Sequence, residues 1–332
     1  MTAVEIENLF AGFAQMKVAV VGDVMLDTYW WGSVERISPE APVPIVALKR
    51  KEYRIGGAGN VALNLVALGA QTTLFTVIGH DADGSQLTQL LTDNNIAASY
   101  LVKSADRATT NKTRVMSRNQ QMMRLDAEVT HDINDAEATE LLSNFNQFIS
   151  TEKPDAVIFE DYNKGVLSPS VIGNMIAAAN HHGIITAVDP KRKNFFAYKG
   201  VTLFKPNLKE VYEGLNMLPE EITTQSLEEV HRQLHNKLQH AISLITLSEK
   251  GVFYQQGEQA GLYGSHVRNI ADVSGAGDTV IAVASLVYAA TKNIQATAAI
   301  ANIAGGLVCE EVGTAAINKQ KLLQECNALL TG

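Results

Sequence analysis

Six short apolar runs recur along the chain, and most are followed by a segment in which apolar residues have helical spacing. The runs are KVAVVG (17–22), TTLFTVIG (72–79), DAVIFE (155–160), IITAVD (184–189), VTLFKPN (201–207) and ISLITLS (242–248). Strands that are apolar throughout are buried on both faces, and parallel strands need long, usually helical, connections. The alternation therefore predicts an α/β fold with a central, mostly parallel sheet flanked by helices.

Two segments break this alternation. Residues 28–54 and 97–125 contain β-prone residues, prolines and aromatics without an intervening amphipathic helix. They predict a few antiparallel strands outside the main sheet, forming a small β lid or a flap that joins two copies in a homodimer. Because the sequence shows neither a flexible linker nor a fixed-period repeat, we expect residues 1–332 to form one domain with the lid as an insertion.

The charge balance and the cysteines restrict the class of protein. With 27 Lys and Arg against 35 Asp and Glu, the formal net charge is −8, and the basic residues are scattered, so a nucleic-acid partner is not expected. Only Cys309 and Cys326 are present, without CxxC spacing, which favours a reducing compartment. We find no secretion signal and no membrane span, and expect a cytoplasmic protein.

The stretch DVSGAGDT (272–279) places three small residues and an acid in front of an apolar helix. At Gly275, Ala276 and Gly277 the backbone can approach a ligand closely, and helix-start N–H groups form a cradle for an anion. If the anion is a phosphoryl group, Asp278 could take the proton of the attacking hydroxyl, and we expect it at a helix-start surface. The alternative is a tight turn with a helix-dipole acid, which the motif alone favours.

A second glycine cluster, GGAGNVALNLVALG (56–69), also opens a helix. Its Gly57, Gly59 and Ala62 satisfy the GxGxxA pattern of a dinucleotide-binding turn. That fingerprint should follow the first strand, yet here the first strand runs into DVMLD, where Asp23 and Asp27 lie. Each of these two acids could bind sugar hydroxyls or cap a turn, and the sequence leaves both readings open.

The two glycine clusters, in this order around the predicted sheet, resemble the ribokinase-like (phosphofructokinase B type) carbohydrate kinase family over essentially the whole chain. The first signature fits from Gly56 through Asn60 to Gly79, and the second from Asp272 to Ala282, with Val283 where a smaller residue is usual. PNLKE (206–210) resembles the NxxE motif of the family, although alone it reads as a helix capping box.

The resemblance implies a ribokinase-like fold, ATP and Mg²⁺ as cofactors and a monovalent cation such as K⁺. It also implies a site. Catalysis falls to Asp278 with Gly275, Ala276 and Gly277. Sugar-binding candidates are Asp23, Asp27, Gly56, Gly57, Asn60, Asp161, Lys164 and Arg124. Nucleotide-binding candidates are Asn207, Lys209, Glu210, Thr246, Ser248, Gly251 and Asn302, with VGTAAI (312–317) near the adenine; metal candidates are Glu210 and Asp189.

Four segments most resemble the kinases of D-glycero-β-D-manno-heptose 7-phosphate in lipopolysaccharide-core synthesis: GDVMLDTYWWGSVERISPEAPVPI, SRNQQMMRLDAE, EDYNKGVL and VDPKR. Such kinases phosphorylate the anomeric hydroxyl of a sugar that already carries a distal phosphate. Lys164 is the favoured cation for that phosphate, ahead of Lys191, Arg192, Arg118 and Arg124. Another sugar or nucleoside kinase of the family, or a non-catalytic sugar or nucleotide sensor, is the alternative.

Overall fold

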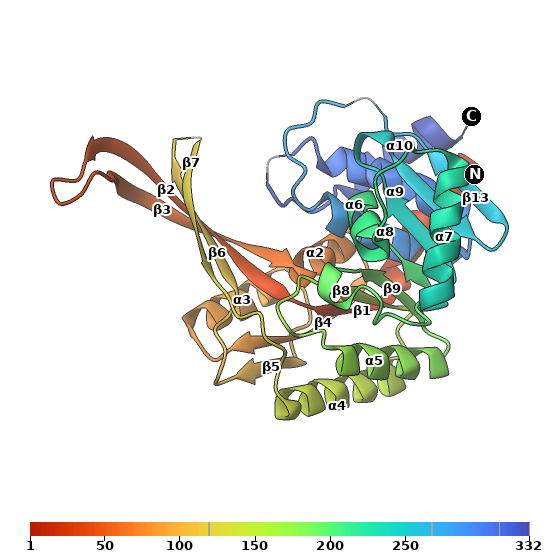
Figure 1. The fold of residues 1–332 in the computed structure, drawn as a ribbon, viewed down its shortest axis with the longest axis horizontal. Helices are drawn as coiled ribbons and strands as arrows, with labels where there is room; N and C mark the ends of the chain where they lie inside the picture. Colours follow the sequence, from red (N-terminus) through yellow and green to blue (C-terminus); the bar gives the residue numbers. More distant parts are fainter. Residues whose placement is uncertain (119, 267, 312, 332) are drawn as a thin grey trace.

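A nine-stranded sheet runs through the centre of the protein in the order β13-β12-β11-β10-β9-β8-β1-β4-β5 (Figure 1). The computed structural model describes residues 1–118, 120–266, 268–311 and 313–331. The strands are β1 (Lys17–Gly22), β4 (Gln71–Gly79), β5 (Leu101–Ser104), β8 (Ala156–Glu160), β9 (Ile185–Asp189), β10 (Leu203–Phe204), β11 (Ile242–Thr246), β12 (Val252–Gln256) and β13 (Gln259–Tyr263). All six predicted runs are strands of this sheet, and its pairings from β11 to β5 are parallel.

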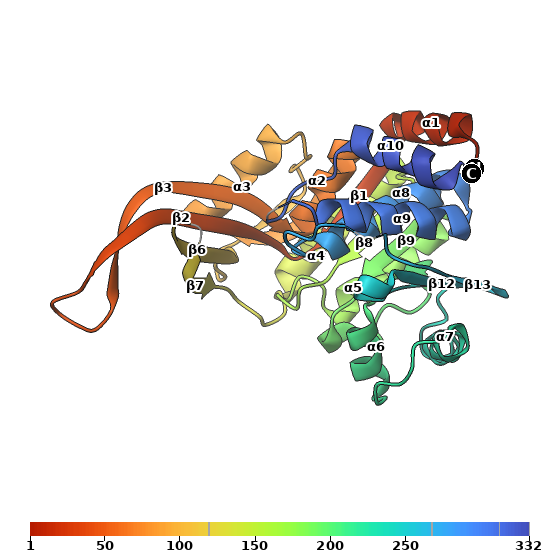
Figure 2. The ribbon, with the colours of Figure 1, turned by 90° about the horizontal axis from the view of Figure 1, so that it is seen from above.

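Helices cover both faces of the sheet, which confirms the predicted α/β architecture. Alternate strand residues enter two separate cores: Val20 and Ile158 pack in one, Val21 and Phe159 in the other. The first core is covered by α1 (Ala3–Gly12), α2 (Ala58–Leu68), α3 (Ala82–Asp93), α8 (Ala276–Thr291), α9 (Ile294–Val308) and α10 (Lys319–Leu330). The second is covered by α4 (Asp135–Glu152), α5 (Pro169–His181), α6 (Leu208–Leu215) and α7 (Thr224–Leu238) (Figure 2).

One antiparallel hairpin at the edge of the sheet was not predicted. Strands β12 and β13 turn at Gly257, which has φ +58°, and pair antiparallel with each other and with β11. The sequence does contain the signal, because a short Gly-containing turn separates two β-prone runs here.

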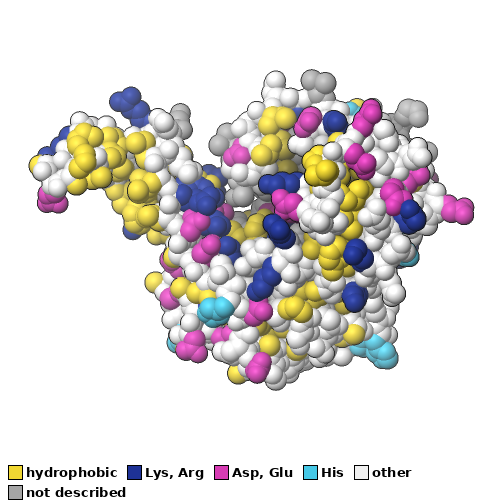
Figure 3. Space-filling model, in the orientation of Figure 1, with side chains coloured by type: hydrophobic (Ala, Val, Ile, Leu, Met, Phe, Trp, Pro, Cys, Tyr) yellow, Lys and Arg dark blue, Asp and Glu magenta, His cyan; other side chains and the backbone are white. Residues whose placement is uncertain are grey.

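A four-stranded sheet forms a lid that projects from the body (Figures 1 and 2). Its strands are β2 (Val24–Ile37), β3 (Pro44–Gly57), β6 (Asn111–Ser117) and β7 (Gln120–Ala127), in the order β3-β2-β6-β7. The pairs β2–β3 and β6–β7 are antiparallel as expected, but β2 and β6 are parallel. Large hydrophobic side chains lie exposed on this sheet and on the turn between β2 and β3 (Figure 3): Ile37, Val43, Leu48, Met122, Met123 and Leu125.

The second predicted lid segment, 97–125, was wrong at its N-terminal end. Residues Leu101–Ser104 pair in parallel with β4 and extend the main sheet, because Val102 is buried in the body. The first predicted lid segment, 28–54, was too short at both ends. Strand β2 already begins at Val24, and β3 continues to Gly57.

The two helices that open with a glycine, α2 and α8, both begin at the carboxyl ends of the parallel strands. Gly57 precedes α2 with φ +60°, and a Cβ there would lie 2.3 Å from the carbonyl oxygen of Asp23. Gly275 precedes α8 with φ +78°. Because backbone with positive φ favours glycine, these two turns explain the two motifs locally. Among the described residues, no helix has the length and apolar character needed to cross a membrane.

Candidate active site

Acidic side chains follow three neighbouring parallel strands. Gly22, Glu160 and Asp189 are register partners at the carboxyl ends of β1, β8 and β9, and Asp23 comes directly after β1. The carboxyl ends of parallel strands are where α/β sheets bind ligands. The first turn of α8 stands over this edge and brings Asp278 to it.

Asp278 is buried rather than exposed at a helix-start surface, so that expectation was wrong. Only 4% of the residue is exposed, because the start of α8 packs against β8 and β9. Its Oδ2 accepts from the Asn60 amide at 2.7 Å and its Oδ1 from the Tyr162 hydroxyl at 2.8 Å. Burial raises the pKa of Asp278 to about 6, against the opposing effect of these two hydrogen bonds. Such a carboxylate is ionised at pH 7 and can accept a proton.

The glycine turn beside Asp278 leaves room for a ligand and offers it donors. A Cβ on Gly275 would lie 2.7 Å from the Asn60 amide nitrogen, and one on Gly277 would lie 3.3 Å from Oδ2 of Asp189. Within the described part of the chain, the backbone N–H groups of Gly277 and Asp278 have no acceptor. These free donors at the start of a long helix form a site suited to an anion.

Two lysines hold Asp189 in place beside the turn. The Nζ atoms of Lys191 and Lys205 lie 3.0 Å and 2.8 Å from Oδ1 and Oδ2 of Asp189, and Lys191 also contacts Oε1 of Glu210 at 2.9 Å. Burial opposes ionisation of Asp189, but the two ammonium groups hold the pKa of its carboxyl below the usual range. Asp189 and Glu210, the two predicted metal ligands, are therefore joined through Lys191.

Glu160, Lys205 and Tyr162 were not among the predicted site residues. Glu160 is fully buried, and neither carboxylate oxygen has a hydrogen-bond partner among the described residues. One carboxylate oxygen from each of Glu160, Asp189 and Asp278 lies within 4.8 Å of the other two. Burial, followed by repulsion from Asp189 and Asp278, raises the pKa of Glu160 well above its ordinary value. The sequence signals were an acid and a lysine ending apolar strands, in VIFE and LFK.

Asp23 faces the chain itself. Its carboxylate accepts from the backbone N–H groups of Tyr162, Lys164 and Val166 at 2.9, 2.9 and 3.1 Å. Three donors occupy most of the lone pairs of a carboxylate, so Asp23 shapes the loop that follows β8. Asp161 acts similarly, accepting from the backbone of Asn163 and from the Tyr198 hydroxyl, each at 2.8 Å.

The other sugar-side candidates lie on the lid strands and on this loop. Asp27, on β2, pairs with Nη1 of Arg114 at 2.5 Å, and a Cβ on Gly56 would lie 2.5 Å from Oδ2 of Asp27. Nζ of Lys164 lies 2.7 Å from Glu128. Arg124 is exposed on β7 and pairs with Asp126 at 2.8 Å; no described contact joins it to the cluster around Asp278.

The nucleotide-side candidates divide into two groups. Asn207 and Glu210 do form a capping box at the start of α6, and Asn207 pairs with Thr246 in an isolated bridge. Ser248 and Gly251 lie in the next turn, both with positive φ. Asn302 instead donates to the Gly264 carbonyl oxygen at 2.9 Å, and the side chain of Lys209 is 84% exposed. Of the adenine segment 312–317, Val312 lies outside the described residues.

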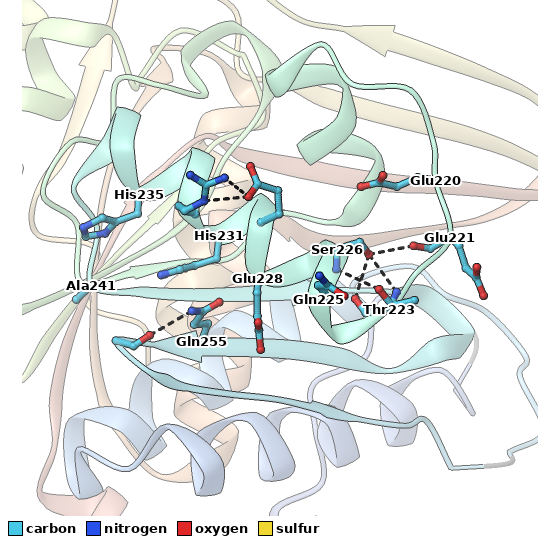
Figure 4. A pocket seen from close by; sticks show the side chains of 13 residues that line it. Glu220, Glu221, Thr223, Gln225, Ser226, Glu228, His231, His235, Ala241 and Gln255 are labelled. Carbon is cyan, nitrogen blue, oxygen red and sulfur yellow. Dashed lines mark hydrogen bonds and ion pairs between the residues drawn. The ribbon is translucent and has the colours of Figure 1, made fainter.

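A groove along α7 is separate from all of these residues. Its lining includes Glu220, Glu221, Glu228, His231 and His235, and none of the predicted site residues (Figure 4).

A mostly parallel α/β sheet with a β lid, and a buried carboxylate beside a glycine turn at a helix start, together define a ribokinase-like kinase. The sequence comparison agrees with this class. Residues 15–321 match the pfkB family of carbohydrate kinases, and the chain belongs to that family.

The chain is also similar in sequence to two longer relatives. The chain is 38% identical over 97% of its length to the bifunctional protein HldE of Syntrophotalea carbinolica, and 40% identical over 95% to that of Methylobacillus flagellatus. It spans 65% and 64% of the length of these relatives.

The same fold occurs in the phosphofructokinase-2 of Escherichia coli in complex with potassium (TM-score 0.77, 19% identity, 96% of this chain and 100% of that one). It also occurs in the ribokinase of Arabidopsis thaliana complexed with ribose and ATP (TM-score 0.71, 18% identity, 93% of this chain and 99% of that one). These comparisons confirm the predicted fold class.

Proposed function

We propose that this chain is an ATP-dependent kinase that phosphorylates the anomeric hydroxyl of D-glycero-D-manno-heptose 7-phosphate, giving the 1,7-bisphosphate on the route to ADP-heptose and the lipopolysaccharide core. The identity of 38–40% to HldE proteins supports the heptose substrate. The observation that carries the chemistry is the buried Asp278, with a pKa of about 6, beside the free N–H groups of α8.

In the proposed step, the anomeric oxygen attacks the γ-phosphorus of ATP and forms the new P–O bond. Asp278 accepts the hydroxyl proton, and the bond between the γ-phosphorus and the bridging oxygen of ADP breaks, so that ADP leaves. The N–H groups of Gly277 and Asp278 stabilise charge on the transferring phosphoryl group. Lys205 lies beside this turn, 3.6 Å from where a Cβ of Gly277 would be, and adds a fixed positive charge.

Asp189 and Glu210 would hold Mg²⁺. The donor set fits, because it contains only carboxylate oxygens, and Mg²⁺ prefers oxygen ligands while keeping several waters. When bound, the ion neutralises part of the charge of the nucleotide phosphates. Asn207, Thr246, Ser248 and Gly251 line the adjoining edge as nucleotide contacts, with Lys209 and Asn302 as outer candidates. A monovalent cation such as K⁺ belongs to the proposal by family resemblance, and no step depends on it.

The sugar would lie between the lid and the loop after β8. Asn60 is suited to bind it, because its Oδ1 is buried and lacks a described partner while its amide holds Asp278. Asp27 and the close backbone at Gly56 and Gly57 form the lid side of this space. We assign Asp23 and Asp161 to shaping the loop and not to contacting sugar.

Lys164 is the proposed contact for the distal phosphate. Lys112 and Lys164 both pair with Glu128, at 3.3 and 2.7 Å, so two ammonium groups lie around one carboxylate. A dianion could recruit both, because each side chain is only 16–17% exposed and so lies at a partly desolvated position. Arg124 is the alternative cation.

The exposed apolar side chains of the lid support a homodimer that buries them against a second copy. Met123, 54% exposed, and Leu125, 47% exposed, are two residues apart on β7 and therefore point to the same face. We place the activity in the cytoplasm, where ATP is available.

The deciding experiment measures ADP release from MgATP with heptose 7-phosphate, fructose 6-phosphate, ribose, adenosine or no acceptor. Release with the heptose alone supports the proposal. Release with another acceptor retains the kinase and rejects the substrate, whereas no release with any acceptor rejects the kinase in favour of a sugar or nucleotide sensor.

A further inference from the structure

Two elements hold the carboxylate of Asp278, one on each oxygen. Asn60 of α2 donates to Oδ2, and Tyr162 of the loop after β8 donates to Oδ1. We propose that Tyr162 is a positioning residue that fixes the orientation of Asp278 for proton transfer. This inference rests on the proposed kinase function.

The geometry of the two bonds carries the argument. A carboxylate held at one oxygen can still rotate about its Cβ–Cγ bond, whereas donors on both oxygens fix its plane. Each oxygen retains a second lone pair, so the tether leaves a position for the proton of the substrate. Proton transfer depends steeply on such alignment, which makes a fixed carboxylate the more effective base.

Tyr162 is itself held at both ends. Its backbone N–H donates to Oδ2 of Asp23 at 2.9 Å, and its ring lies 5.6 Å from Nζ of Lys191. Lys191 in turn contacts Asp189 and Glu210. The hydroxyl therefore reaches Asp278 from a side chain whose backbone and ring are both anchored.

Three charged groups act on Asp278 directly: Glu160 on β8, Asp189 on β9 and Lys205 after β10. Lys191 after β9 pairs with Asp189, and Glu210 on α6 pairs with Lys191. A change from tyrosine to phenylalanine leaves all of them, and the aromatic ring, in place. It removes one neutral donor, so it tests the tether separately from the electrostatic field.

Tyr198→Phe provides a matched control, because the Tyr198 hydroxyl also donates to a buried aspartate, Oδ2 of Asp161, across 2.8 Å. We expect Tyr162→Phe to lower kcat about tenfold, the scale of a hydrogen bond to a charged group, with the KM for MgATP unchanged. Tyr198→Phe should lower the thermal midpoint at least as much as Tyr162→Phe does. It should change kcat less than about twofold.

The discriminating measurement is a double-mutant cycle. In the Asp278→Asn background, Tyr162→Phe should cost less than about twofold, because a residue that acts through Asp278 has nothing left to position. Equal losses in the two backgrounds, an unchanged kcat in the single variant, or an equal loss of kcat in Tyr198→Phe would each overturn the inference.

Crystal structures of the two phenylalanine variants, without substrate, separate this inference from the proposed function. We expect the Asp278 carboxylate to turn in Tyr162→Phe only. An unmoved Asp278 overturns the inference even when wild-type activity is established. A turned Asp278 in a chain whose wild type releases no ADP rejects the kinase function and retains the tether.

Discussion

The side-chain amide of Asn60 donates to Oδ2 of Asp278 across 2.7 Å, although the two residues are 218 positions apart. Each belongs to a helix that opens with a glycine of positive φ, α2 after Gly57 and α8 after Gly275. The contact therefore joins the two glycine motifs of the sequence in one site. It also explains why Gly275 cannot carry a side chain, since a Cβ there would lie 2.7 Å from the same amide nitrogen.

Replacing Asp278 by asparagine should lower kcat by about 10²–10⁴-fold, the usual contribution of a positioned general base. We expect the fold to persist, because the buried position then holds a neutral group. Coupled-enzyme assays of ADP release measure the loss, and circular dichroism with thermal unfolding checks the fold. Turnover within about threefold of wild type would contradict the assignment of Asp278 as the base.

The rate should depend on pH through the same carboxylate. Burial raises the pKa of Asp278 from 3.8 to about 6. The protonated form cannot accept a proton, so kcat/KM for the sugar should be constant above about pH 7 and fall about tenfold per pH unit below 6. A profile measured from pH 4.5 to 8.5 tests this, and an acid limb centred near 4 would show that another group limits the reaction.

Lys164→Ala should raise the KM for the phosphorylated sugar by about tenfold or more, because one charge-assisted contact to the distal phosphate is lost. The KM for MgATP should not change. Lys199→Ala, an exposed lysine outside the proposed site, is the control. Equal sugar KM values for the two variants would remove Lys164 from the phosphate site and direct attention to Arg124.

Charged residues on the lid should dissociate the proposed dimer. Met123→Lys combined with Leu125→Lys places two like charges on each copy at the exposed apolar face. Sedimentation velocity should show a shift from dimer to monomer at micromolar concentration. Leu218→Lys changes an equally apolar residue that is 87% exposed outside the lid, and it should leave the assembly intact. A wild-type monomer would refute the proposed dimer.

Two buried histidines should make the fold sensitive to acid. His231 Nδ1 and His240 Nε2 share the Ser243 hydroxyl at 2.8 and 2.7 Å beside the groove of Figure 4. Burial lowers the pKa of His231 to about 4 and that of His240 to about 3. Their folded-state pKa values lie below the unfolded value of 6.5. Their contribution to the stability of the fold is therefore complete above about pH 6.5 and falls between pH 6.5 and 3.

The free energy of unfolding, measured with urea between pH 7.5 and 5, should therefore fall by at most about 2 kcal/mol for each of these histidines by pH 5. His231→Asn should flatten that dependence. The exposed His181, replaced in the same way, should leave it unchanged. Parallel curves for all three proteins would exclude His231 as a source of the dependence.

The sequence predicted most of the main sheet because its strands are apolar throughout and need no tertiary information to be recognised. It also predicted the glycine turn at the start of α8, since a turn with positive φ favours glycine whatever the rest of the fold. Glu160, Lys205 and Tyr162 could not be found in the same way. They meet only through the register of β1, β8, β9 and β10, which no local pattern encodes.

Two other errors have physical explanations. Residues 101–104 are β-prone in both the predicted lid and the observed sheet, so composition could not assign the sheet to which they belong. Asp278 was expected at the surface because acids at helix starts are usually exposed, but here the sheet edge, the loop after β8 and α2 cover it.

The two long strands of the lid end inside the site. Strand β2 begins at Val24, directly after Asp23, and β3 ends at Gly57, three residues before Asn60. The covalent backbone that reaches the tip of the lid is thus the backbone that carries the residue holding Asp278. The tip of the lid lies at one end of these two strands, and Asn60 lies just beyond their other end. A residue at the tip of the lid and the residue that holds the proposed base are therefore joined by one continuous pair of strands.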